Sequence, residues 1–255
     1  MTEKSKDYQS IFNQRGHLYN AATSLCPTAR DNELAALLDL IHFQERDTLC
    51  DAPAGGGFVA EGVRRLNYSH CPITCFEPAE NFAAAISSEF DVHISEVDKL
   101  PVKDGFFSIV TSLAGLHHVD QRQDIFNEWR RVITPTGQCV VADVATNTGI
   151  ARFLNGFVNE FCPGGHEGLF FEQGEFSHLL DSAGFEPLTD QLETVPWRFK
   201  SQLQMGIFCK GLFGLQDVTS EQVAQALHDI VGTKTQDSGQ VQLLWQLQYA
   251  KGIAR

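Results

Sequence analysis

Three consecutive glycines, Gly55 to Gly57, lie between a short apolar run and a helical pattern. The apolar run ends in Asp51, and the helical pattern begins at Phe58. Glycine tolerates unusual dihedrals and, having no side chain, lets the backbone approach a bound group closely. The helix that follows presents unpaired N–H groups and a partial positive charge to an anion. This strand–glycine–helix turn therefore predicts a binding site for a nucleotide-like cofactor.

Histidines are the clearest candidates for proton transfer, because imidazole titrates near neutrality. His117 and His118 follow the apolar run 106–114, and His166 lies in the glycine-flanked loop 163–168, which could move over a site. We take His118 as the first candidate base, with His117 and His166 as further catalytic candidates. The alternatives are that the paired histidines cap the following helix and that His166 is a surface residue.

Alternating apolar patterns define the elements that must position these residues. Several expected strands are apolar throughout, as in a parallel sheet covered by helices on both faces. This predicts an α/β fold with a doubly wound, Rossmann-like sheet, in which ligands bind beyond the carboxyl ends of the strands. The expected helices are 31–41 (capped by Asp31 or Asn32), 58–66, 79–90 and 120–132, and the expected strands are 48–52, 73–77, 92–97, 106–114 and 138–144.

The C-terminal part has a different pattern. The run 241–249 places apolar residues on one face with a period of two, which predicts a last strand, antiparallel to the others. Ten of the nineteen phenylalanines fall between Phe153 and Phe213, which indicates a second small core, an aromatic cap over a substrate pocket, or both. The other expected elements are helices 150–161, 174–183, 201–213 (capped by Ser201) and 220–231 (capped by Ser220), and the strand 185–195.

We therefore expect four segments. Residues 1–30 form a helical segment over the cofactor site, and residues 31–149 form the cofactor-binding core. Residues 150–235 form a cap and substrate region with a sixth strand and inserted helices. Residues 236–255 form the terminal antiparallel strand.

Composition excludes several classes of protein. The net charge is −13, from 19 basic and 32 acidic residues without a basic cluster, which disfavours a nucleic-acid partner. No apolar stretch approaches the roughly 18 residues of a membrane helix, and the N-terminus lacks the apolar region of a signal peptide, so we expect a cytoplasmic protein. The seven scattered cysteines suit thiols in a reducing compartment, and no metal site is predicted.

The chain resembles the class I S-adenosylmethionine (SAM)-dependent methyltransferases, specifically the small-molecule members with a single core domain. The resemblance covers about residues 31–144. The segment 51–57, Asp-Ala-Pro-Ala-Gly-Gly-Gly, looks like the acidic, glycine-rich first motif, and Glu77 ends the second expected strand. The segment 98–101, Asp-Lys-Leu-Pro, resembles the one that flanks adenine, and 131–137 resembles the turn before strand five.

The resemblance implies SAM as cofactor and assigns roles to particular residues. Asp51 would attract the ammonium group, Glu77 would accept from the ribose hydroxyls and Asp98 from the adenine amino group. Asp51 and Asp98 could instead cap loops or helices. Pro53 departs from the family pattern, because it replaces the usual first glycine and stiffens the loop. The expected cofactor contacts are Arg15, Asp51, Ala52, Ala54, Gly55, Gly57, Glu77, Asp98, Lys99, Leu100 and Leu113.

The implied reaction is methyl transfer to a small, largely apolar or aromatic metabolite, with an O- or C-acceptor favoured if His118 removes a proton. Orientation alone supplies about 7–11 kcal/mol and a general base about 3–5 kcal/mol, so the base is optional. One alternative is an NAD(P)-dependent oxidoreductase, because 55–60 fits G-x-G-x-x-A and Glu77 follows Gly57 by twenty residues. The acid before the glycines and the terminal strand argue against it. A non-catalytic SAM-binding module is the other alternative.

Overall fold

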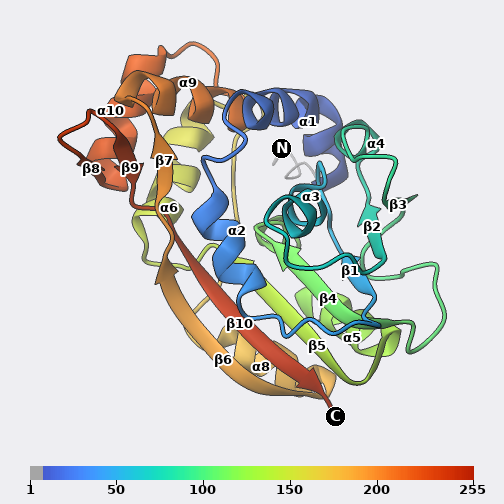
Figure 1. Ribbon diagram of the computed structural model, residues 1–255. Coiled ribbons are helices and arrows are strands. Elements are labelled where there is room, and N and C mark those ends of the chain that lie inside the picture. The colour runs from blue at the N-terminus through green and yellow to red at the C-terminus, as the bar shows by residue number, and fades with distance from the viewer. Residues whose placement is uncertain (1–7) are drawn as a thin grey trace, which may run out of the picture.

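A computed structural model describes residues 8–255 of the chain, except for the side chain of Ser10 (Figure 1). A seven-stranded sheet with the order β3-β2-β1-β4-β5-β10-β6 forms its centre. All pairs from β3 to β5 are parallel, whereas β10 runs antiparallel to both of its neighbours. The predicted doubly wound sheet with an antiparallel last strand is confirmed. The strands are β1 (Leu49–Asp51), β2 (Ile73–Glu77), β3 (Asp91–Ile94), β4 (Phe107–Leu113), β5 (Ile133–Asp143), β6 (Phe185–Thr194) and β10 (Gln246–Ala254).

Helices cover both faces of this sheet (Figure 1). On one face, α2 and α3 join a large apolar cluster that continues into the C-terminal part of the chain. On the other face, α5 and α8 pack against each other over a second cluster. Among residues 8–255, no helix combines the length and the apolar character needed to cross a bilayer. The helices named here are α2 (Asp31–Leu38), α3 (Phe58–Arg65), α5 (Arg122–Val132) and α8 (Glu175–Ala183).

A second layer lies beyond the carboxyl ends of the central strands (Figure 1). It contains α1 (Tyr8–Leu25), α9 (Gln202–Leu212) and α10 (Ser220–Ile230), in which α9 packs against both of the others. A helical stretch of three parts, α6 (Gly149–Arg152), the π-helical η2 (Phe153–Val158) and α7 (Asn159–Phe161), adjoins them. A small antiparallel sheet of the order β7-β9-β8 completes the layer, with β7 (Trp197–Phe199), β8 (Thr233–Thr235) and β9 (Val241–Leu243).

Several expected elements differ in extent. The turn expected at 131–137 is absent, because α5 ends at Val132 and β5 begins at Ile133. Two further elements are shorter than expected. The alanine-rich helix 79–90 is only the four-residue α4 (Glu80–Ala83), because the chain then tightens into i→i+3 turns that pack Ile86 against Gly57. The expected strand 241–249 is interrupted after β9, where Trp245 stacks on Trp197 with ring centroids 4.0 Å apart. Local propensity is overridden in both places by packing against distant segments.

Helix caps were predicted with mixed success. Ser201 caps α9 by accepting a hydrogen bond from the Gln204 N–H, as expected. The cap of α10 is Thr219 rather than Ser220, and it forms a reciprocal capping box with Gln222. Helix α2 begins after Arg30, whose side chain makes no capping bond, so neither Asp31 nor Asn32 is the cap.

Candidate active site

The glycine bend between β1 and α3 has the backbone conformation that its sequence demands. Gly55 has φ of +56° and Gly57 has φ of +84°, in the left-handed region that favours glycine. Gly57 is the N-cap residue of α3. A Cβ atom on Gly56 would lie 2.2 Å from Asn20 Oδ1, and one on Gly55 would lie 3.0 Å from the Phe82 ring. Side chains from α1 and α4 therefore cover the bend closely.

Asp51, the last residue of β1, is buried beside this bend. Neither of its carboxylate oxygens has a hydrogen-bond partner among residues 8–255. Burial, and then the nearby charge of Glu77, raises the pKa of Asp51 well above its usual range. Burying a carboxyl group without a hydrogen-bond partner costs free energy. A cationic ligand beside Asp51 would offset this cost.

Glu77 ends β2 and is held in place by three hydrogen bonds. Its Oε2 accepts from the Gly55 N–H (2.8 Å) and the Tyr8 hydroxyl (3.0 Å), and its Oε1 accepts from the Ala79 N–H (2.9 Å). Burial is the main reason that its pKa is raised to about 7. The carboxylate is thus aimed at the glycine bend, with a tyrosine hydroxyl of α1 on one of its oxygens.

The other expected cofactor residues fall into two groups. A pocket at the bend, called the glycine pocket below, is lined by Asp51, Ala54, Gly55 and Leu113 together with Tyr8, Phe12 and Phe82. Ala52 is buried beside it. Residues 98–100 do not line this pocket in the described chain: Asp98 and Lys99 are exposed, and the N–H of buried Leu100 donates to Glu128 Oε1 (2.6 Å).

A second pocket, the histidine pocket, adjoins the glycine pocket. The two share Phe12, Tyr19, Arg30 and Ala114 in their linings. Ala114 has φ of +57°, a strained conformation that residues other than glycine seldom adopt. Arg15 lines the histidine pocket and not the glycine pocket, and its Nη1 donates to Cys162 Sγ (3.2 Å).

Aromatic rings and three histidines form the walls of the histidine pocket. Trp197, Trp245 and Phe213 line it, so the aromatic-rich C-terminal part contributes to the pocket as well as to a core. Phe12 lies at its border, where its ring stacks on Phe82 (centroids 4.7 Å apart) and meets the His118 ring edge to face (5.3 Å). The rings enclose a largely apolar space that has polar groups on one side.

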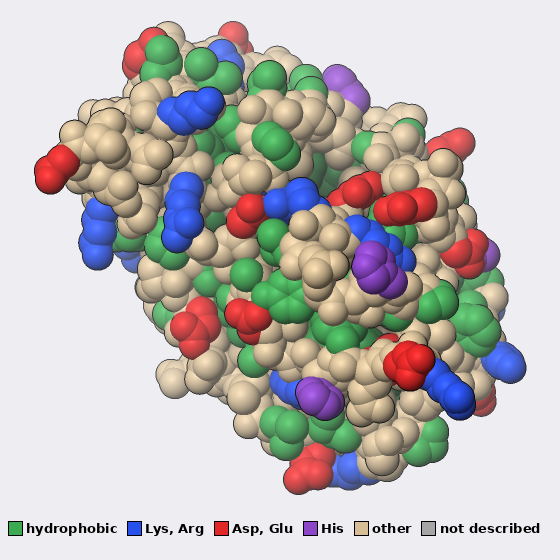
Figure 2. All heavy atoms as spheres, in the orientation of Figure 1, with side chains coloured by type: hydrophobic (Ala, Val, Ile, Leu, Met, Phe, Trp, Pro, Cys, Tyr) green, Lys and Arg blue, Asp and Glu red, His purple; other side chains and the backbone are tan. Residues whose placement is uncertain are grey.

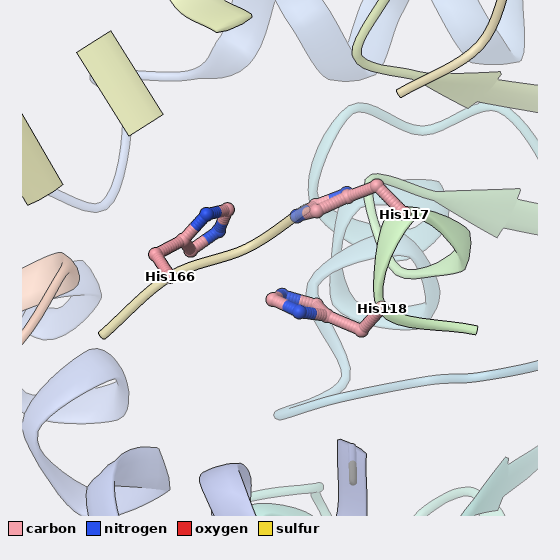
Figure 3. A group of neighbouring side chains, drawn as sticks. All are labelled: His117, His118 and His166. Atoms are coloured by element: carbon pink, nitrogen blue, oxygen red, sulfur yellow. The ribbon is translucent and has the colours of Figure 1, made fainter. Parts of the chain in front are cut away.

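Figure 3 shows that His117, His118 and His166 converge from two separate segments. His117 lies in the 3₁₀ turn η1 (Leu116–His118), and its Nδ1 is 2.6 Å from Asp143 Oδ1. Asp143, fully buried at the end of β5, also accepts from the backbone N–H groups of Leu116 (2.7 Å) and Val144 (2.7 Å). These bonds fix the orientation of the His117 ring.

His166 is buried rather than on the surface, at 5% exposure. Its Nδ1 is 3.0 Å from Asn155 Oδ1, and Asn155 belongs to η2. Desolvation, the other histidines and Arg15 lower the pKa of both His118 and His166 well below the usual range. Both imidazoles are therefore neutral at physiological pH. His117, His118 and His166 were each predicted as candidates from the sequence, and the fold brings them together.

Several residues at the site were not anticipated. Asp143 could have been found as an acid at the end of an apolar strand. Arg30 forms a buried ion pair with Glu33 (2.5 Å) at the border of both pockets, and its i,i+3 spacing was a signal. No local pattern marks Asn155, because its role depends on the π-helical turn.

Comparisons with known proteins agree with this architecture. Residues 50–141 match a family model described as a methyltransferase domain, and no curated protein matches the chain. A SAM-dependent methyltransferase from Thermotoga maritima, a possible histamine N-methyltransferase, is 15% identical over 97% of this chain and 100% of that one, with a TM-score of 0.65. Geranyl diphosphate C-methyltransferase from Streptomyces coelicolor A3(2), solved with Mg²⁺, geranyl diphosphate and S-adenosyl-L-homocysteine, is 14% identical over 93% and 84%, with a TM-score of 0.58. The [4+2]-cyclase SpnF is 16% identical over the whole of both chains, with a TM-score of 0.61.

At these identities the solved structures establish the fold, and the family model supplies the class of protein. The matched segment runs from β1 through the glycine bend to β5 and so contains the glycine pocket's core residues. The antiparallel β10, inserted between β5 and β6, differs from a sheet of six parallel strands in the order 3-2-1-4-5-6. Residues 50–141 thus carry a methyltransferase domain, and together with the fold this supports a class I SAM-dependent methyltransferase with SAM as cofactor.

Proposed function

We propose that this enzyme methylates an oxygen or carbon atom of a small, largely apolar or aromatic molecule that binds in the histidine pocket. The observation that carries the proposal is the junction of the two pockets at Phe12 and Ala114. A donor in the glycine pocket and an acceptor in the histidine pocket would meet there. Orientation of two reactants is the largest contribution that such a site can make.

The residues of the glycine pocket fit the cofactor. Asp51 offers two buried, unpartnered oxygens to an ammonium group, and Glu77 is placed for the ribose hydroxyls. The N-terminus of α3 at Gly57 suits the cofactor's carboxylate. When bound, SAM supplies an electrophilic methyl group on a positively charged sulfur. Contacts of Asp98, Lys99 and Leu100 with adenine remain part of the proposal, as does a contact of Arg15 with the carboxylate.

Walls of the histidine pocket indicate the class of acceptor. Trp197, Trp245 and Phe213 favour a flat or apolar molecule, and Arg15 favours an anion such as a phenolate, an enolate or a carboxylate. On the face drawn in Figure 2, Lys and Arg side chains are scattered among acidic ones, and the net charge is −13. Both observations favour a small molecule over a nucleic acid.

His118 is the proposed general base. Its ring lies between Phe12, at the donor side, and His166, at the acceptor side, with centroid distances of 5.3 and 5.1 Å. Residues 8–30 would cover the cofactor, and residues 150–235 would close the acceptor pocket. Both regions exclude water from the reacting atoms.

Formation of S-adenosylhomocysteine with a panel of phenols, enols and carboxylic acids tests the proposal. We expect turnover with at least one class. We also expect His118→Ala to lower turnover 10²–10⁴-fold, as for loss of a general base, and to leave SAM affinity within about twofold. Binding of SAM without turnover on any acceptor would make the protein a non-catalytic SAM-binding module. Loss of SAM binding in His118→Ala would make that residue structural.

A further inference from the structure

The three histidines of the histidine pocket lie with their ring nitrogens close to one another. One ligand atom from each of His117, His118 and His166 lies within 4.8 Å of the others. Two of the residues come from the turn after β4, and the third comes from the loop after α7 (Figure 3). Three imidazoles that present their ring nitrogens to one space are a donor set that zinc and similar divalent ions prefer.

Hydrogen bonds fix which nitrogen of His117 faces this space. Its Nδ1 lies 2.6 Å from Asp143 Oδ1, so Nδ1–H donates to the carboxylate and Nε2 keeps its lone pair. Carboxylate–histidine pairs of this kind orient metal ligands and raise their basicity. Asp143 is in turn held by three backbone N–H groups, those of Leu116, His117 and Val144, so the pair is rigid.

The same reasoning applies to His166 through an amide. Asn155 Oδ1 accepts from the Gly168 N–H (2.8 Å), and the amide Nδ2 donates to the Gly168 carbonyl (2.9 Å). These two bonds identify Oδ1 as the oxygen, so the His166 Nδ1 at 3.0 Å must be the donor. Nε2 of His166 then carries no proton and keeps its lone pair. Two histidines from distant segments are thus locked in the tautomer that leaves Nε2 as the ligand.

We propose that His117, His118 and His166 bind a divalent transition-metal ion of the zinc type, which holds the anionic oxygen of the methyl acceptor. This inference rests on the proposed function and names its substrate class: a phenol, enol or carboxylic acid that coordinates through oxygen. Three protein ligands leave a coordination position open, as in catalytic zinc sites. The positive charge of Arg15 on the same pocket favours an anion in that position.

Binding the ion requires only local movement. Zn–N bonds of about 2.1 Å place tetrahedral ligands roughly 3.4 Å apart, so the nitrogens must approach by about 1 Å. Among residues 8–255, no hydrogen bond to the His118 ring is found, so only its contacts with neighbouring rings set its orientation. The loop before His166 contains Gly164 and Gly165, both with positive φ, and can adjust.

The chemistry balances without a redox partner. The acceptor's acidic proton passes to water when its oxygen coordinates the ion. The electron pair of that oxygen, or of a carbon conjugated with it, forms the new bond to the methyl carbon while the carbon–sulfur bond breaks and leaves its pair on sulfur. With the ion bound, Lewis-acid stabilisation of the anion replaces proton transfer to His118.

Metal binding by the purified full-length chain, freed of metal by a chelator, tests this inference. Titration calorimetry with Zn²⁺ is expected to give one equivalent per chain. Co²⁺ is expected to show the visible bands of a four- or five-coordinate nitrogen site, without the charge-transfer band of cysteine ligation. His166→Ala and His118→Ala should abolish these signals, and Asp143→Asn should weaken Zn²⁺ binding 10–100-fold.

His178→Ala is the matched control, because His178 is exposed on α8 outside the pocket. Where an alanine variant fails to fold by circular dichroism, His118→Gln and His166→Gln replace it. Zn²⁺ binding that is absent, or unchanged in the pocket variants, would overturn the inference. SAM titration of the same samples separates the two ideas. SAM binding without Zn²⁺ binding leaves the proposed function intact, whereas Zn²⁺ binding without SAM binding refutes the proposed function alone.

Discussion

At the scale of single residues, two buried carboxyl groups lie at the glycine bend. Asp51 and Glu77 end adjacent strands, and both have raised pKa values. The charge of Glu77 is one cause of the raised pKa of Asp51. Glu77 binds more protons in the folded chain than in the unfolded one. The stability that it contributes to the free protein therefore falls as pH rises from about 4.5 to about 7. A cationic ligand that donates hydrogen bonds reverses this penalty.

This linkage predicts a pH dependence of SAM affinity. Because SAM selects the ionised form of Glu77, whose pKa is about 7, affinity should rise as pH increases from 6 to 7.5. Each released proton contributes at most a tenfold change per pH unit below the pKa. Calorimetry at several pH values measures the slope. Glu77→Gln should weaken binding at least tenfold and flatten the slope, whereas an equal slope in that variant would assign the titration to another group.

The residue scale also shows what the sequence could identify. The glycine bend, Asp51 and Glu77 were found because each follows a buried strand, where the chain positions a side chain with little freedom. The pairing of His117 with Asp143, and of His166 with Asn155, was not found. Those partners are 26 and 11 residues apart. The neighbouring strands β4 and β5 bring the first pair together, and the π-helical turn η2 brings the second pair together.

At the scale of elements, α1 covers the glycine bend. The Tyr8 hydroxyl donates to Glu77, and the stacked rings of Phe12 and Phe82 lie over the glycine bend. The Tyr8 bond must give way wherever a ribose hydroxyl takes the same Glu77 oxygen. Helix α1 thus competes with the cofactor through one bond while it encloses the pocket.

Removing that competing bond should strengthen cofactor binding. A hydrogen bond contributes about 0.5–1.5 kcal/mol net, so Tyr8→Phe is expected to lower the Kd for S-adenosylhomocysteine roughly two- to tenfold. Tyr68→Phe is the matched control, since Tyr68 also donates to a carboxylate, that of Asp39, away from the pocket. Weaker binding in Tyr8→Phe alone would show that the hydroxyl assists the cofactor instead.

The contact between α2 and α3 depends on a glycine in a helix interior. A Cβ atom on Gly62 would lie 2.0 Å from Leu34 Cδ2, and both residues are buried. Gly62→Ala should therefore destabilise the chain by about 1–3 kcal/mol through overpacking, despite the better helix propensity of alanine.

Gly156 provides the comparison for that substitution, because a Cβ atom there meets nothing within 4 Å. Gly156→Ala should stabilise the chain by about 0.4–1 kcal/mol. Denaturant unfolding of the two variants measures both changes. Equal effects of the same sign would show that helix propensity, and not the approach of α2 to α3, decides the outcome.

The elements differ in how well the sequence predicted them. The central strands were placed within a few residues because continuous apolar runs have one interpretation in a covered parallel sheet. The helix at 79–90 and the strand at 241–249 were drawn too long, since Ile86 and Trp245 leave the local pattern to pack on Gly57 and Trp197. Sequence periodicity does not register such distant partners.

At the scale of the whole molecule, the sheet and the second layer contribute to different parts of the proposed site. The carboxyl ends of β1 and β2 carry the carboxylates proposed to bind the donor, and elements of the second layer (α1, η2, α9 and β7) contribute to the lining of the histidine pocket, where the acceptor is proposed to bind. The sheet could be predicted because a parallel sheet repeats one simple pattern. In the second layer the helices 150–161, 201–213 and 220–231 were predicted, whereas the π-helical turn, the strands β7 and β8 and the aromatic stacking were not, because they depend on contacts between distant segments.

The most direct test of this account is titration of the purified full-length chain with SAM and with S-adenosylhomocysteine, alongside thermal unfolding. We expect one ligand per chain. At 100 times Kd, the ligand should stabilise the chain by about 2.7 kcal/mol, which raises Tm by roughly 5–10 °C. Both signals should be lost or weakened at least tenfold in Glu77→Ala. No heat and no rise in Tm with either compound would contradict the assignment of the glycine bend and Glu77 to the methyl donor.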